Sequence, residues 1–206
     1  GMIPCHHTIP HAPFTRTQFT YDTAPKEFID AGGDLHDVWP SNGTWEGKHY
    51  VLAGQELTVK PAGRPSGWVY ILDDTDPANL KVAGRWTIPV EREWQGYLAF
   101  SLHYIGMVDR TLFVSSYHAG LWAVDLSTPE HIKSPPTLGV FIPDKTPPMP
   151  PSAKAQTATP DIEDVIPQPD GTLLTFDAYT GAYVLRFHNE TAVPTLPPGT
   201  DEQPAK

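Results

Sequence analysis

One pattern of short strands recurs along this chain, and it limits the fold more than any other feature does. The clearest copy is TLFVSSYHAGLWAVDLSTPE, residues 111–130, which predicts two consecutive strands, a turn at Ala119-Gly120 and a polar exit loop. An earlier copy is GWVYILDDTDPA, residues 67–78, and a later one is TLLTFDAYTGAYVLRF, residues 172–187. Self-similarity of this kind is the signature of a repeat architecture. The chain is therefore predicted to consist of equivalent β-units.

Each unit contains the same order of predicted strands. The first strands are LHDVWP, LHYIGM and IEDVIP, and the fourth strands of the first two units are VAGRWTI and TLGVFIP. One four-stranded sheet cannot bury both of its faces, whereas sheets stacked around an axis can. We therefore predict an all-β fold, a β-propeller made of four-stranded antiparallel blades. A sandwich or barrel is the alternative, although neither requires the same strand order to recur.

The predicted organisation is one β-propeller repeat domain over residues 1–190 and a disordered tail over residues 191–206. The clear units span residues 35–89, 101–143 and 161–188, an irregular amino-terminal unit spans residues 1–34, and residues 144–160 form a Pro-rich loop. Three clear units leave an open ring with unpaired strand edges. Three solutions stay open: a four-bladed ring within one chain, a homo-oligomer that closes a larger ring, and a fragment of a longer protein.

Composition excludes several classes of protein. The net charge is −10 and the 14 Lys and Arg residues are not clustered, which argues against nucleic acid as a partner. No apolar run approaches the roughly 20 residues of a membrane span. The amino-terminal sequence GMIPCHHTIPH has neither the charged start nor the apolar core of a signal peptide. The single cysteine, Cys5, predicts a fold without an internal disulfide.

A metal site is the sharpest chemical hypothesis. In a propeller the first strand of each blade lines the central channel, and His36, His103 and Glu163 occupy one equivalent position on those strands. Imidazoles with a carboxylate suit zinc, copper, iron or manganese, so a divalent transition metal is the predicted cofactor. Glu56 and His118 end second strands near the same mouth and are the predicted catalytic proton carriers. The alternative is that these side chains only hydrogen-bond neighbouring blades.

The motif G-x-W/Y-x-V-x-D/L-x-S/T-x-P, carried by GLWAVDLSTPE and GWVYILDDTDP, resembles the LVIVD-repeat β-propeller family over roughly residues 35–187. The chain departs from that family in its shortened first unit and its low number of repeats. The resemblance implies an extracellular or periplasmic location. The family is similar in architecture to selenium-binding proteins and methanethiol oxidases, and this implies metal binding through histidine at the propeller face.

Three functions remain open on the sequence. The first is a binding module for a protein or carbohydrate partner, with Tyr117, Tyr179 and Trp122 lining either a ligand pocket or the packing between blades. The second is a metal-dependent enzyme, an oxidoreductase or a hydrolase. The third is a structural repeat protein of a cell surface or envelope.

Overall fold

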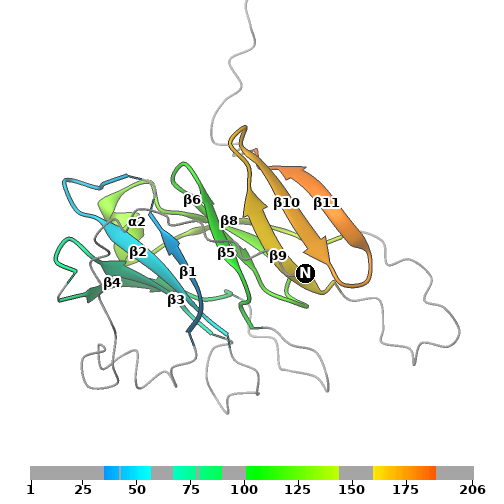
Figure 1. The fold of residues 1–206 in the computed structure, drawn as a ribbon, viewed down its shortest axis with the longest axis horizontal. Coiled ribbons are helices and arrows are strands. Elements are labelled where there is room, and N and C mark those ends of the chain that lie inside the picture. The colour runs from blue at the N-terminus through cyan, green and yellow to red at the C-terminus, as the bar shows by residue number, and fades with distance from the viewer. Residues whose placement is uncertain are drawn as a thin grey trace, which may run out of the picture.

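The computed structural model describes residues 35–41, 43–56, 67–77, 79–89, 101–143 and 160–188 of the chain. These residues are mostly β-structure and form three antiparallel sheets that lie next to one another (Figure 1). The irregular unit predicted over residues 1–34, the Pro-rich loop up to residue 159 and the tail predicted over residues 191–206 lie outside the described residues. Among the described residues no helix has the length and apolarity that a membrane span needs.

The three sheets correspond to the three clear units. The first contains β1 (Leu35–Pro40), β2 (Tyr50–Gln55), β3 (Val69–Asp73) and β4 (Lys81–Trp86), paired in chain order. The second contains β5 (Ile105–Val108), β6 (Thr111–Ser115), β7 (Leu121–Asp125) and β8 (Thr137–Phe141), and the third contains β9 (Ile162–Pro167), β10 (Thr172–Asp177) and β11 (Gly181–Arg186). The all-β class and the antiparallel order are confirmed. The described strands do not close into a ring, so the propeller stays a prediction.

The first two sheets repeat one another down to an irregularity in strand register. Tyr50 pairs with Asp73 across β2 and β3, and Thr111 pairs with Asp125 across β6 and β7. In both sheets the register between the third and fourth strands shifts just before that aspartate, which marks a β-bulge at the same place. Each aspartate then accepts a hydrogen bond from the backbone N–H two residues later. The sequence repeat is therefore a structural repeat.

The exit loop of the second unit differs from its prediction as a loop, because it contains the short helix α2 (Pro129–Lys133). Thr128 is the N-cap, and its hydroxyl accepts a hydrogen bond from the backbone N–H of His131 at 3.2 Å. Ile132 is buried, and α2 packs against β4 of the first sheet. A helix of five residues is too short for its apolar period to be recognised in the sequence.

The sheets pack face to face through buried apolar side chains. A large cluster between the first and second sheets combines residues of β2, β3 and β4 with residues of β5, β6 and β7. A smaller cluster between the second and third sheets includes Phe113, Ala123, Val165 and Leu173. Because side chains alternate along a strand, each sheet can offer one apolar face to each of its neighbours.

One aromatic contact recurs at both junctions between sheets. Trp86 at the end of β4 lies 6.2 Å from Trp122 of β7, measured between ring centroids. Phe141 at the end of β8 lies 5.4 Å from Tyr183 of β11. In each case the fourth strand of one sheet contacts the third strand of the next. The indole N–H of Trp86 also donates a hydrogen bond to the hydroxyl of Thr137. This hydrogen bond joins the first and second sheets in addition to their apolar contacts.

The first strands of the sheets run beside one another. β1 contacts β5, and β5 contacts β9, which also contacts β6 (Figure 1). The carboxylate of Asp37 joins β1 to β5, because it accepts hydrogen bonds from the N–H groups of Val38 and Ile105, both at 2.8 Å. The starts of these strands are therefore held close to one another.

The outer face of the third sheet exposes a row of large apolar side chains. Leu174 of β10 pairs directly with Ile166 of β9 on one side and with Val184 of β11 on the other. All three are exposed, as is Phe176 two residues further along β10. Exposed apolar rows of this kind usually mark a surface that another element covers.

Gly84 and Gly139 offer a matched test of the packing between sheets, because they hold equivalent places in β4 and β8 opposite Ile71 and Ala123. A Cβ on Gly84 would overlap the carbonyl oxygen of Ile132 in α2, whereas a Cβ on Gly139 meets nothing within 4 Å. Gly84→Ala should lower the free energy of unfolding by about 3 kcal/mol. Gly139→Ala should change it by less than about 0.5 kcal/mol.

Urea denaturation of the two variants measures both values. Equal losses in the two variants would mean that the contact between α2 and β4 does not carry the stability assigned to it.

Candidate metal centre

The candidate site lies at one edge of the sheets, and antiparallel pairing explains why. The start of a first strand and the end of the second strand are neighbours in an antiparallel pair. His36 is the second residue of β1 and Glu56 follows β2, while His103 precedes β5 and Tyr117 follows β6. Glu163 lies in β9 of the third sheet. Residues far apart in the chain therefore meet at this edge.

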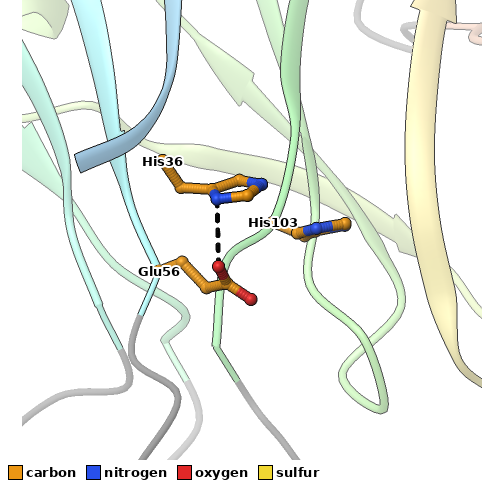
Figure 2. Close-up of side chains that lie close together, drawn as sticks. All are labelled: His36, Glu56 and His103. Atoms are coloured by element: carbon orange, nitrogen blue, oxygen red, sulfur yellow. Dashed lines mark ion pairs between the residues drawn. The ribbon is translucent and has the colours of Figure 1, made fainter. Parts of the chain in front are cut away.

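Three of these side chains form a group that can hold a metal ion. His36, Glu56 and His103 each offer one ligand atom, and the three atoms lie within 4.8 Å of one another. Figure 2 shows the two imidazole rings and the carboxylate gathered together. His36 Nδ1 lies 3.0 Å from Glu56 Oε2, and the rings of His36 and His103 stack with centroids 4.6 Å apart. His36 is exposed, whereas Glu56 and His103 are half-buried.

The donor set fits a divalent transition metal. Zinc binds imidazole nitrogen and carboxylate oxygen at about 2.0–2.2 Å, so its tetrahedral ligand atoms lie about 3.3–3.6 Å apart. The 3.0 Å separation of His36 from Glu56 is already close to that spacing. The three ligand atoms all lie within 4.8 Å of one another, so metal binding requires only that the widest separation shorten toward the tetrahedral spacing.

We call His36, Glu56 and His103 the trio. Glu163, the third predicted metal ligand, lies beside His103 rather than within the trio. Its carboxylate oxygen Oε2 is 3.3 Å from His103 Nδ1, and its backbone carbonyl oxygen is 2.6 Å from the same nitrogen. A carbonyl oxygen can only accept a hydrogen bond. Nδ1 of His103 therefore carries the ring proton and donates a hydrogen bond to the Glu163 carbonyl oxygen. The lone pair of the neutral ring is then on Nε2. Histidine ligands in metal sites are commonly held by a second partner in this way.

Tyr117 contacts two members of the trio. Its hydroxyl donates a hydrogen bond to Glu56 Oε1, and its ring stacks on His103 with centroids 4.8 Å apart. Burial raises the pKa of the Tyr117 phenol far above its ordinary value, and the Glu56 carboxylate raises it further. The phenol therefore stays protonated and remains a donor to Glu56.

Two acidic side chains at the start of the third sheet have raised pKa values: Glu163 lies in β9 and Asp161 directly precedes that strand. Burial raises the pKa of the Glu163 carboxyl, and the nearby Asp161 carboxylate adds to the rise while His103 opposes it. Burial also raises the pKa of Asp161, with His118 opposing that shift. Both shifts have the direction expected when carboxylates lose water near other carboxylates. A cation bound here would relieve that repulsion.

The two predicted proton carriers differ in their places. Glu56 belongs to the trio itself. His118 is buried outside the trio, and its Nδ1 lies 3.9 Å from Asp161 Oδ1. Asp161 interacts electrostatically with both His118 and His103. Asp161 therefore connects His118 to the edge of the site.

The aromatic residues predicted for a pocket or for packing are divided between the two roles. Trp122 is buried between the first and second sheets, whereas Tyr117 belongs to the site. The bond between Tyr117 and Glu56 and the place of Asp161 beside His118 were not predicted from the sequence. In the strand registers, Glu56 after β2 and Tyr117 after β6 are equivalent residues. An alignment of β2 with β6, matched through the aspartates that end β3 and β7, would have placed Glu56 and Tyr117 at the same position.

Comparison with known proteins does not identify a family. No protein-family model matches this chain, and no curated protein matches it. The resemblance to the LVIVD-repeat propellers therefore stays a prediction from the motif.

The raised pKa of Glu163 predicts a pH-dependent effect on stability without metal. A carboxyl with a higher pKa in the folded chain loses its proton less readily there than in the unfolded chain. Its charge then opposes folding increasingly as pH rises through the unfolded and then the folded pKa. Glu163→Gln removes that charge and keeps the backbone carbonyl that holds His103. The variant should be more stable than the original chain at pH 8, and the difference should vanish near pH 3.

Urea denaturation in chelator across this pH range measures the effect. Asp170→Asn is the control of opposite sign, because hydrogen bonds from Thr172 lower the pKa of Asp170. Its carboxylate favours folding at neutral pH, so this variant should lose stability at pH 8 and approach the original chain in acid. If the free energy of unfolding of Glu163→Gln differs from that of the original chain by the same amount at every pH, the charge of Glu163 is not the cause.

Proposed function

We propose that this protein binds a divalent transition metal ion, with zinc as the best fit, through His36, Glu56 and His103. The single observation that carries this proposal is the convergence of two imidazoles and one carboxylate, from three separate chain segments, within ligand distance of one another. Two of the three, His36 and His103, are repeat-equivalent residues of adjacent sheets, and the carboxylate follows the strand paired with β1.

The surroundings of the trio support metal binding over a purely structural role. Each member already has an orienting contact: Glu56 from Tyr117, His103 from Glu163, and His36 from stacking on His103. Ligands held in this way bind metal more tightly, because less conformational entropy is lost on binding. The neighbouring acids also create a negative potential that favours a cation.

Metal binding is tested by elemental analysis and zinc titration of tag-free protein. One zinc per chain should bind, and it should raise the free energy of unfolding by about 2.7 kcal/mol when free zinc is 100 times its dissociation constant. His36→Ala and His103→Ala should each weaken binding at least 100-fold, because each removes one of three ligands. His49→Ala is the matched control, since His49 is exposed and lies outside the trio.

Two results would refute metal binding at this site. One is protein that takes up no zinc, cobalt or manganese on titration. The other is metal that binds equally well to the His103→Ala and His49→Ala variants, which would place the ion elsewhere.

A metal-dependent enzyme, an oxidoreductase or a hydrolase, is the second candidate function. It is favoured by the number of ligands, because three protein ligands leave a fourth position for water or substrate, as in catalytic zinc sites. Glu163 lies next to His103 with a raised pKa, which suits a group that exchanges protons. Azide should change the visible spectrum of the cobalt-loaded protein if the fourth position is open. An unchanged spectrum would favour a closed binding site.

We also infer that the three sheets are blades of an LVIVD-type β-propeller. The proposal is supported by the adjacent first strands, the repeated bulge and the recurrent aromatic contact between sheets. The exposed row of Ile166, Leu174 and Val184 supports a further sheet beyond the third. A binding module for a protein or carbohydrate partner remains part of this proposal by analogy with other propellers. An extracellular or periplasmic location remains part of it because the family resemblance implies that location.

A further inference from the structure

We propose that Tyr117 determines which metal this site prefers, by reserving one oxygen of Glu56 so that only the other can ligate. The inference rests on the proposed metal site and goes beyond it, because it assigns metal selectivity to a residue that is not a ligand. Tyr117 is a positioning residue here.

The two carboxylate oxygens of Glu56 have different partners. Oε1 accepts the hydrogen bond of the Tyr117 hydroxyl, and Oε2 faces Nδ1 of His36 at 3.0 Å. An oxygen that already accepts a hydrogen bond from the half-buried phenol is a poorer metal ligand, and that bond favours one orientation of the carboxylate. Glu56 is therefore poised to bind through Oε2 alone.

Tyr117 is itself held from several sides. Its backbone N–H and C=O both bond to Ile162 at 3.0 Å, which ties the residue to the third sheet. Its φ of 41° lies in the left-handed region that few non-glycine residues adopt. Its ring stacks on His103. These contacts hold the Tyr117 hydroxyl in the place where it donates its hydrogen bond to Glu56 Oε1.

A one-oxygen carboxylate limits the coordination number of the metal. Two imidazoles, one carboxylate oxygen and one exchangeable ligand make the four-coordinate set typical of zinc. Manganese and magnesium prefer six ligands and more oxygen, which a two-oxygen carboxylate would help to supply. Releasing Oε1 should therefore change both affinity and selectivity.

Tyr104 provides a matched control for the same chemical change. Its ring lies edge-on to both His36 and His103, at centroid distances of 5.3 Å and 4.4 Å. It makes ring contacts with the site but no hydrogen bond to Glu56. Tyr104→Phe and Tyr117→Phe each remove one hydroxyl from the same cluster, and only the second releases Glu56 Oε1.

The experiment measures zinc and manganese dissociation constants for the original chain and the two Phe variants, with the visible spectrum of each cobalt-loaded protein. Tyr117→Phe should weaken zinc binding about 10- to 100-fold, as removal of orienting partners does in metal sites. Manganese binding should weaken less than zinc binding, so the zinc-to-manganese preference should fall. The strong absorption of four-coordinate cobalt should decrease as coordination increases. Tyr104→Phe should leave all three measurements unchanged.

A loss of packing alone would not change the cobalt spectrum or the ratio of the two affinities. Equal constants and spectra for Tyr117→Phe and the original chain would overturn the inference while leaving the metal site intact. If the original chain binds no metal, the proposed function fails instead. A crystal structure of the zinc-loaded original chain supplies a readout independent of variant folding: zinc on Oε2 alone supports the inference, and zinc on both oxygens or on the Tyr117 oxygen overturns it.

Discussion

The two-faced nature of a β-sheet governs the arrangement of this protein. Each sheet has apolar side chains on both faces, because residues alternate along every strand, and a sheet of three or four short strands cannot cover either face alone. Packing the sheets face to face covers those residues, with a large cluster at the first junction and a smaller one at the second. The same arrangement aligns β1, β5 and β9 and brings one edge of each sheet together. The polar site depends on this packing, since its members belong to different sheets.

The site has its chemical character because its polar groups are crowded into a partly buried edge. Water is partly excluded from Glu163 and Asp161, so their charged forms are disfavoured, and the two acids also repel each other. The hydrogen bonds that remain are specific: Glu163 fixes the tautomer of His103, and Tyr117 fixes one oxygen of Glu56. A bound cation would reduce the repulsion between these acids, and this supports the proposed metal site.

Equivalent positions in the units carry chemically different side chains on a similar backbone. Strand registers place Glu56 and Tyr117 at the same point after their second strands, and there the acid and the phenol form a hydrogen bond. Gly84 and Gly139 are likewise equivalent, although only Gly84 lies against the helix α2. The third unit departs further, because its described part has three strands and its outer face exposes Leu174, Ile166 and Val184. Equivalent positions of one repeated backbone therefore carry different side chains, and the site is formed from some of them.

The sequence by itself determined the strands, their order and the equivalence of His36 and His103, because apolar alternation and turn residues act over a few positions and leave a local pattern. The sequence also predicted that Glu56 lies near His36, because the end of a second strand lies beside the start of the first strand in an antiparallel pair. Only the tertiary structure decided that Glu56 joins His36 and His103, and that Glu163 accepts a hydrogen bond from the His103 ring. Those choices depend on ångström-scale distances between side chains of different sheets, and no local pattern records such distances. The bond from Tyr117 and the helical turn that packs on Gly84 were decided in the same way, by contacts between segments far apart in the chain.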